Sequence, residues 1–320
     1  LAACGEREEP TASSPAAPQR VRLLLDYFPN ADHAGLYAAQ GEGFFREQGL
    51  DVELQTPPDP AGVLQLLRAG RADVAISYEP ELLLARAQGA RVQSVGALVQ
   101  VPLTSLMAVG DRPLREAADL RGATVGTAGI AYQTAYLRTI LERARLPRDA
   151  VRQVDVGFNL VPTMLSGRVD ATLGAFWNVE GVELERRGRR PSILRMERLG
   201  VPTYDELILV AREETVRDQG AMLRRLLQAV ARGHAAVRDD VETGVQPLVR
   251  ANPDLERPLQ VAQVRATLPV FFPGGGRPFG WHEPAEWGTY ARWMADNGLL
   301  PDPRVVERAY TNEFLPGEGP

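Results

Sequence analysis

Polar and aromatic side chains gather directly after an apolar stretch near the start of the chain, and their types suit ligand binding. Residues 21–25 read as a buried strand, which is followed by Asp26, Tyr27, Asn30 and His33. Ligands of open α/β sheets lie beyond the carboxyl ends of the strands, so these side chains are placed where a small molecule could be held. An ordinary strand-to-helix loop is the alternative, but a Tyr-Phe pair beside two carboxylates and a histidine is more than a turn requires.

The same combination of aromatic and polar side chains borders three later apolar stretches. Its members are Tyr78 and Glu79 after residues 72–77, Trp177, Asn178 and Glu180 after residues 171–175, and Tyr204 and Asp205 before residues 206–211. Aromatic side chains can sandwich a flat ring, and carboxylates accept hydrogen bonds from exocyclic amino or ring N–H groups. Any one of these aromatic residues is more often part of a core, so the prediction depends on their recurrence at strand ends.

The sequence offers no constellation for catalysis. The three histidines, His33, His234 and His282, fall in unrelated contexts, and no Gly-X-Ser-X-Gly or His-Glu-X-X-His motif occurs. All 36 basic residues are arginine, so no lysine amine can form a Schiff base with a carbonyl substrate or pyridoxal phosphate. Glu79 and Glu81 could do acid-base work, but acidic residues at a helix N-terminus are ordinary helix-dipole chemistry. We therefore predict recognition without a catalysed reaction, a cofactor or a metal.

A glycine-containing turn is a weaker candidate. Gly126, Thr127 and Gly129 precede a helix expected to begin at Tyr132, where backbone N–H groups could face an anion or another ligand group. The turn lacks the Gly-Lys-Ser/Thr of a P-loop and the spacing of a dinucleotide fingerprint, so a plain tight turn fits equally well.

Strand-like and helix-like stretches alternate along the chain, which predicts an α/β fold. Strands are expected at residues 21–25, 50–55, 72–77, 93–98, 104–110, 123–126, 151–156, 171–175 and 206–211, with helices between most of them. This order implies mostly parallel sheets flanked by helices.

Two segments have similar sequences and suggest two similar lobes. Residues 67–75 (LRAGRADVA) resemble residues 164–172 (MLSGRVDAT), each with a helix end, a glycine cap, Arg-X-Asp and then a strand. Such capping is common, so the repeat alone is weak evidence for two similar lobes. It is strengthened by the aromatic and acidic residues that follow both strands. We place the crossover near Val109. This gives one lobe of residues 21–108 plus 209–320 and a second of residues 109–208, which could close as a clamp on one ligand.

Composition limits the partners and the compartment. The 320 residues carry a formal charge of -5, which argues against nucleic-acid binding. The single cysteine, Cys4, excludes internal disulfides and Cys-based metal clusters. Its context, Leu-Ala-Ala-Cys, looks like the tail of a bacterial lipobox, with a leftover free thiol as the alternative. Residues 1–20 are then a lipid anchor and flexible tether, and no later run approaches the roughly 20 apolar residues that cross a bilayer.

One part of the sequence resembles a known family. DYFPNADHAGLY at residues 26–37, followed by GFFREQGLDV at residues 43–52, is similar to the thiamin-pyrimidine-precursor binding proteins of ABC importers. The resemblance extends from about Val21 to Leu300 and is specific at Pro-Asn-X-X-His-X-Gly-Leu-Tyr. The superfamily also includes fungal pyrimidine synthases and receptors for other flat molecules such as flavins. The synthase branch of the family that this chain resembles needs a pyridoxal-binding lysine and a Cys-rich iron motif. This sequence has neither.

The resemblance implies a two-lobed periplasmic-binding-protein fold of type II, with hinge strands and an aminopyrimidine held between the lobes. Carried over residue by residue, the contacts would be Asp26, Tyr27, Asn30, His33, Tyr78, Glu79, Trp177, Asn178, Glu180, Tyr204 and Asp205. Tyr27 stands where several relatives carry Trp. The implied protein is a monomeric, extracytoplasmic lipoprotein that delivers its ligand to an ABC permease and ATPase. Riboflavin is the near alternative ligand, and a pyrimidine synthase-like enzyme is the distant alternative.

Overall fold

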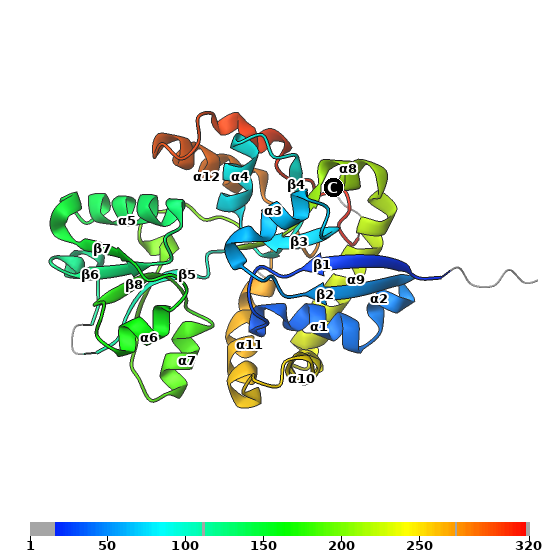
Figure 1. The fold of residues 1–320 in the computed structure, drawn as a ribbon, viewed down its shortest axis with the longest axis horizontal. Coiled ribbons are helices and arrows are strands. Elements are labelled where there is room, and N and C mark those ends of the chain that lie inside the picture. The colour runs from blue at the N-terminus through cyan, green and yellow to red at the C-terminus, as the bar shows by residue number, and fades with distance from the viewer. Residues whose placement is uncertain (1–16, 111–112, 273, 318–320) are drawn as a thin grey trace, which may run out of the picture.

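The structure of the protein, a computed structural model, describes residues 17–110, 113–272 and 274–317 and contains two α/β lobes (Figure 1). The first lobe is built on a five-stranded sheet in the order β2-β1-β3-β10-β4, with β10 antiparallel to both neighbours. Its strands are β1 (Gln19–Leu24), β2 (Leu50–Gln55), β3 (Val74–Ser77), β4 (Val92–Val99) and β10 (Leu207–Arg212).

The second lobe repeats this arrangement. Its sheet has the order β7-β6-β8-β5-β9, and β5 is antiparallel to both neighbours. The strands are β5 (Thr104–Ala108), β6 (Thr124–Thr127), β7 (Arg152–Asp155), β8 (Ala171–Phe176) and β9 (Ser192–Arg195). The predicted α/β class is confirmed, and in each lobe the strand that follows a crossing between lobes is the antiparallel one.

The boundary between the lobes differs from the predicted one. We expected the crossover near Val109, whereas β5 already pairs with β8 and β9 of the second sheet. Residues 104–108 therefore lie in the second lobe, and residues 207–208 at the start of β10 lie in the first. An apolar run reads the same in either sheet, so only the pairing partners distinguish the lobes.

Helices flank both sheets (Figure 1). The first lobe has α1 (Ala34–Gly41), α2 (Phe44–Glu47), α3 (Val63–Arg68), α4 (Glu79–Ala87), α8 (Glu213–Asp218), α9 (Gly220–Asp239), α10 (Glu242–Ala251), α11 (Arg257–Phe271) and α12 (Pro284–Asp296). The second lobe has α5 (Ala131–Arg143), α6 (Leu160–Leu165) and α7 (Glu180–Arg186). Short 3₁₀ turns are η1 (Ala31–His33), η2 (Pro60–Gly62), η3 (Ala117–Leu120), η4 (Arg148–Ala150), η5 (Met196–Arg198) and η6 (Pro303–Arg308).

Alternation along the strands sends side chains to two helical layers. In β3, Val74 and Ile76 join the apolar cluster that contains α1 and α9, while Ala75 joins the cluster that contains α3 and α4. Successive strand residues point to opposite faces, so a sheet buried on both sides is apolar throughout. This is why the strands read as continuous apolar runs in the sequence.

The similarity between residues 67–75 and residues 164–172 reflects the same pair of hydrogen bonds in both lobes. The Asp73 backbone N–H donates to Arg22 O, and an Asp73 carboxylate oxygen accepts from Arg22 N. In the second lobe Asp170 makes the same two bonds with Thr124. Each aspartate thus ties the strand that it begins to the neighbouring parallel strand.

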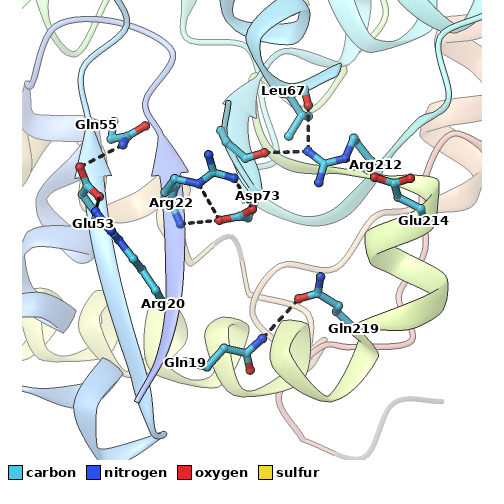
Figure 2. A network of polar contacts seen from close by, with 11 residues as sticks. Gln19, Arg20, Arg22, Glu53, Gln55, Leu67, Asp73, Arg212, Glu214 and Gln219 are labelled. Atoms are coloured by element: carbon cyan, nitrogen blue, oxygen red, sulfur yellow. Dashed lines mark hydrogen bonds and ion pairs between the residues drawn. The ribbon is translucent and has the colours of Figure 1, made fainter. Parts of the chain in front are cut away.

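The first of these ties belongs to a wider network on the strand ends of the first lobe (Figure 2). The Arg22 guanidinium also contacts Asp73, with 2.8 Å between Nη2 and Oδ1. Arg212 reaches back from the end of β10 and donates to Leu67 O at 2.9 Å and to Ala72 O at 2.7 Å. The network fixes α3, β1, β3 and β10 relative to one another at the amino ends of the parallel strands.

Helices α1 and α9 approach each other closely enough to require glycine. A Cβ atom added to Gly233 would lie 2.1 Å from Gly35 O. No shift of a flexible side chain can relieve such a contact, because the obstructing atom belongs to the backbone. This contact places α1, and with it the loop between β1 and α1.

Replacing Gly233 by Ala should therefore destabilise the first lobe. We expect the free energy of unfolding to fall by about 3 kcal/mol, because helices in a packed core cannot separate without losing contacts. Gly288→Ala is the matched control, since a Cβ there would meet only Arg292 Nη1 at 3.5 Å. It should leave stability unchanged or raise it by up to about 1 kcal/mol through helix propensity. Urea unfolding measures both, and equal effects would contradict the packing argument.

Candidate ligand-binding cleft

A cavity of about 390 Å³ lies between the lobes, at the carboxyl ends of the parallel strands. This volume suits a small molecule. The lining comes from loops and helix starts of both lobes and from the returning crossover: Asp26, Tyr27, Phe28, Pro29, Asn30, Pro60, Ala61, Tyr78, Glu81, Thr104, Ala128, Gly129, Ile130, Tyr132, Gln133, Phe158, Leu160, Gly174, Phe176, Val179, Glu180 and Glu206.

Seven predicted site residues lie in this lining: Asp26, Tyr27, Asn30, Tyr78, Gly129, Tyr132 and Glu180. They come from both lobes, so the structure brings the strand ends together around one space. The other predicted residues lie outside the lining.

His33 supports Asp26 from behind the cavity wall. Its Nε2 lies 2.8 Å from Asp26 Oδ1, and its Nδ1 accepts from the Asn30 backbone N–H at 3.2 Å. Nε2 must therefore carry the proton that is donated to Asp26. The Tyr78 hydroxyl donates to the other carboxylate oxygen at 2.6 Å. Burial alone raises the pKa of Asp26, but these two hydrogen bonds lower that pKa below its usual range.

Trp177 does not stack on the cavity as predicted. Its ring is buried, with the Arg195 guanidinium 3.8 Å from the ring centroid, and its Nε1 donates to Pro102 O at 3.1 Å. Asn178 is also fully buried and donates to Asp32 of the first lobe. Both side chains point into the lobe contact because the chain turns sharply after β8, and of the three residues predicted here Glu180 alone lines the cavity.

Tyr204, Asp205 and Glu79 are buried beside the crossover that returns to the first lobe. The Tyr204 ring packs against Tyr136 and Tyr290. Glu79 Oε2 accepts from the Asp205 backbone N–H at 2.7 Å. Burial, together with the nearby Asp205 carboxylate, raises the pKa of Glu79 well above its usual range. None of these three predicted residues lines the cavity, and their contacts are with other buried residues of the protein.

Asp205 also belongs to a Ser-His-Asp row that the sequence did not reveal. Ser94 Oγ lies 2.9 Å from His282 Nε2, and His282 Nδ1 lies 2.6 Å from Asp205 Oδ2. The spacing matches that of hydrolase triads. All three residues are buried, however, and none lines the cavity, so no substrate carbonyl could reach the serine. We interpret the row as a structural contact. It joins Ser94 of β4, Asp205 of the returning crossover and His282 of the loop before α12.

The glycine turn contributes only its second half to the cavity. A Cβ on Gly126 would press on Val156 and Val169, and the Thr127 hydroxyl accepts from Gln153. Neither residue lines the cavity. The Ala128 N–H, which could have served an anion, already donates to Gln133 Oε1 at 2.8 Å. The turn therefore presents Gly129 and Tyr132 and does not form an anion cradle.

Two acidic lining residues, Glu81 and Glu206, were not predicted. Glu206 accepts hydrogen bonds from the segment that enters β5. The donors include Leu103 N at 2.7 Å and Thr104 N at 2.9 Å. Burial raises the pKa of each of these glutamates to about 7. The period of β10 could have indicated Glu206, because it shares a strand face with Ile208 and Val210 and stands at the cleft end.

Glu81 and Glu180 are the acids with an oxygen available to a ligand. The Ser77 hydroxyl donates to Glu81 Oε2 at 3.2 Å, and the Phe176 N–H donates to Glu180 Oε2 at 2.7 Å. These bonds engage Oε2 of each residue, and both side chains line the cavity. Burial raises the pKa of Glu180 to about 7 as well. These two glutamates face the cavity from opposite lobes.

Aromatic side chains form the mouth of the cavity. Phe28 and Phe158 are 56% and 43% exposed, and they are the large apolar side chains that stand out as exposed among the described residues. The Tyr27 ring contacts both, with centroid distances of 5.1 Å and 5.4 Å. Exposed apolar side chains at a cleft indicate binding. No motif in the sequence identified Phe158, which lies in the loop between β7 and α6.

The charge of the lining is one-sided. Among the described residues it contains four carboxyl groups and no arginine, lysine or histidine. Such a cavity disfavours an anion and favours a flat molecule with several hydrogen-bond donors. No cluster of His, Cys, Asp and Glu within the described part of the chain is arranged to hold a metal ion.

Comparison with known proteins agrees with this geometry. Residues 30–242 match the family described as NMT1/THI5 like. The chain is 32% identical to a formylaminopyrimidine-binding protein of Halalkalibacterium halodurans, over 98% of this chain and 94% of that one. It is 26% identical to a 4-amino-5-hydroxymethyl-2-methylpyrimidine phosphate synthase of Legionella pneumophila, over 93% and 92% of the two chains.

Solved structures establish the fold. The alkanesulfonate-binding protein SsuA of Xanthomonas axonopodis superposes with a TM-score of 0.69 at 18% identity, over 92% of this chain and 99% of that one. The predicted two-lobed periplasmic-binding-protein fold is thereby confirmed. No helix in the described ranges has the length and apolar character to span a bilayer.

Proposed function

The chain belongs to the NMT1/THI5 like family, and we propose that it is the solute receptor of an ABC importer for a thiamin-related aminopyrimidine. Residues of both lobes would close around the ring, and the loaded receptor would deliver it to a membrane permease and ATPase. The relative from Halalkalibacterium halodurans, which is named for binding formylaminopyrimidine, supports this choice of ligand.

The composition of the cavity lining carries the proposal. Aromatic rings at the mouth offer stacking surfaces, and Glu81 and Glu180 offer oxygens to amino groups from two sides. Because one oxygen of each glutamate already accepts from Ser77 or Phe176, the other is the one that an amino group of the ligand would use. An alkanesulfonate is an anion and does not suit this lining, although the fold is shared.

A thermal-shift panel tests the proposal. The panel contains formylaminopyrimidine, 4-amino-5-hydroxymethyl-2-methylpyrimidine, its phosphate, thiamin and riboflavin. We expect the two uncharged pyrimidines to raise the melting temperature and the phosphate to have no effect, because four carboxyl groups line the cavity. Riboflavin alone would support the flavin alternative, and such a preparation would be yellow. If no compound of the panel raises the melting temperature, both the pyrimidine and the flavin proposals are refuted.

The synthases in the family raise the alternative of an enzyme. We propose that this chain catalyses no reaction, because it has no lysine to bind pyridoxal phosphate covalently. Incubation with pyridoxal phosphate and iron, followed by mass spectrometry, would reveal a pyrimidine product if this is incorrect.

The same proposal includes an extracytoplasmic location and a lipid anchor on Cys4. Cys4 lies outside the described residues, so its support is the Leu-Ala-Ala-Cys context alone. Incorporation of radiolabelled palmitate into the full chain, and its loss in Cys4→Ser, would establish the anchor.

Tyr27→Ala should weaken ligand binding without disturbing the fold. Tyr27 is only partly buried, and its ring spans from Phe28 of the first lobe to Phe158 of the second. We expect an affinity for formylaminopyrimidine about tenfold lower, which corresponds to the loss of one stacking contact. Calorimetric titration measures the affinity, and Tyr310→Phe outside the cavity is the control for an altered tyrosine. An unchanged affinity would show that the ligand lies elsewhere.

A further inference from the structure

A buried cluster of polar side chains joins the two lobes beside the cavity. Asn178, which follows β8 in the second lobe, donates from Nδ2 to Asp32 Oδ1 at 2.6 Å and to Thr267 Oγ1 at 2.8 Å. Asp32 lies in η1 and Thr267 in α11, both in the first lobe. The Thr267 hydroxyl is also 3.3 Å from Asp32 Oδ1. We call Asp32, Asn178 and Thr267 the interlobe cluster.

The interlobe cluster is shielded from water and does not touch the cavity. Asp32 is 2% exposed, Asn178 and Thr267 are 0% exposed, and none of the three is in the cavity lining. Burial raises the pKa of Asp32 to about 6, and the Asn178 and Thr267 donors oppose that rise. Replacing Asn178 by an apolar residue would leave Asp32 Oδ1 with only the 3.3 Å contact to Thr267 in a site shielded from water, which costs more than the bond itself.

Each half of the interlobe cluster is connected to a wall of the cavity by a short piece of chain. In the first lobe, the Asp32 backbone N–H donates to the side chain of Asn30, which lines the cavity. In the second lobe, Val179 and Glu180 follow Asn178 directly and also line it. Helix α11 adds a further tie, because Gln263 Nε2 donates to Val179 O at 3.0 Å. In Figure 1, α11 (orange) lies next to α7 (green).

We propose that Asp32, Asn178 and Thr267 are positioning residues that hold the two cavity walls at the separation required for binding. They set ligand affinity without touching the ligand. An intact cluster keeps Glu180 opposite Glu81, and a broken cluster lets the lobes separate. The ligand therefore escapes faster, while its chemical selection by the lining stays the same. The affinity part of this inference rests on the proposed function, but the lobe separation can be measured without any ligand.

Thr267→Val is the first test, because valine keeps the shape of threonine and removes only the hydroxyl. We expect the affinity for formylaminopyrimidine to fall about tenfold, mainly through a faster dissociation rate. The ratio of affinities for formylaminopyrimidine and 4-amino-5-hydroxymethyl-2-methylpyrimidine should not change. Thr172→Val is the matched control, since Thr172 is equally buried but lies within the second lobe against Met164. Its affinity should stay within about twofold of the parent.

Lobe separation is measured on the ligand-free protein by electron paramagnetic resonance. Nitroxide labels at Ala69→Cys and Arg186→Cys, two exposed positions in different lobes, report the distance in a Cys4→Ser background. Asn178→Leu and Thr267→Val should both shift the distribution to longer and broader distances, while Thr172→Val should not. An unchanged distribution would refute the inference, even if no pyrimidine bound. Equal affinity losses in Thr267→Val and Thr172→Val, or a changed affinity ratio, would also overturn it.

Discussion

Glu180→Gln should lower the affinity for formylaminopyrimidine by about a hundredfold, or about 3 kcal/mol. The Phe176 N–H donates to Oε2 of Glu180, and the Glu180 side chain lines the cavity. Glutamine would keep its oxygen on Phe176 and turn its NH₂ group toward the amino group of the ligand. Two donors would then face each other in a space where both are removed from water, which costs more than a missing bond.

Glu183→Gln is the control for this substitution. Glu183 lies on the same helix, but it pairs with Arg187 at 2.7 Å and does not line the cavity. Isothermal titration calorimetry on both variants separates a ligand contact from a general effect of charge on α7. If Glu180→Gln bound as tightly as the parent, Glu180 would not be a ligand contact.

The stability of the folded protein should fall as the pH rises, whereas in ordinary acid denaturation it falls as the pH is lowered. Glu81, Glu180 and Glu206 have pKa values raised by burial from 4.5 to about 7. Between these values the folded protein binds more protons than the unfolded chain, so its stability falls as the pH rises. His234, whose pKa burial lowers to about 4, acts in the opposite direction below about pH 6.5. We therefore expect the ligand-free protein to lose at least about 2 kcal/mol between about pH 6.5 and pH 8, because Glu79, whose pKa is raised further, acts in the same direction.

Glu81→Gln isolates one part of this dependence. A glutamine can still accept from Ser77 through its carbonyl oxygen, and it carries no charge at any pH. The stability advantage of the variant over the parent should grow by about 1.3 kcal/mol between pH 6 and pH 8. Urea unfolding at several pH values measures the difference. A parent protein whose stability rises over this interval would contradict the assigned burial of these acids.

Alternation and capping made most of the fold predictable from the sequence. Strands such as residues 72–77 were recognisable because both faces are buried, and the repeated Arg-X-Asp signals correspond to Asp73 and Asp170 at equivalent places in the two lobes. The pairing of β5 was not predictable in this way. Its partners, β8 and β9, lie more than sixty residues further along the chain, and no local signal specifies them.

The candidate site was predictable as a place but only partly as a set of side chains. The strand-end residues Asp26, Tyr78 and Glu180 all line the cavity, because carboxyl ends of parallel strands converge at one edge. Strand ends could not show which way a side chain turns after the strand. Trp177 therefore seemed a stacking partner but is buried under Arg195. Glu81 seemed a helix-dipole residue, although a helix N-terminus beside a cavity also presents its side chains to a ligand.

The likeness to an alkanesulfonate-binding protein illustrates why fold alone does not select the ligand. Two lobes around a cleft can enclose an anion or an amino-substituted ring, and the lining decides between them. In this chain the basic residues are all arginine, yet no arginine within residues 17–110, 113–272 and 274–317 lines the cavity. The distribution of charge within the cleft, more than the architecture around it, supports an aminopyrimidine.

The most direct test of the account is calorimetric titration of the full chain with 4-amino-5-hydroxymethyl-2-methylpyrimidine and with its phosphate ester. The two molecules share the ring and differ in the anionic group, which the four carboxyl groups of the lining should reject. We expect one pyrimidine bound per chain and an affinity at least about a hundredfold weaker for the ester. Equal or tighter binding of the phosphate would contradict the assignment of this cleft to an uncharged aminopyrimidine.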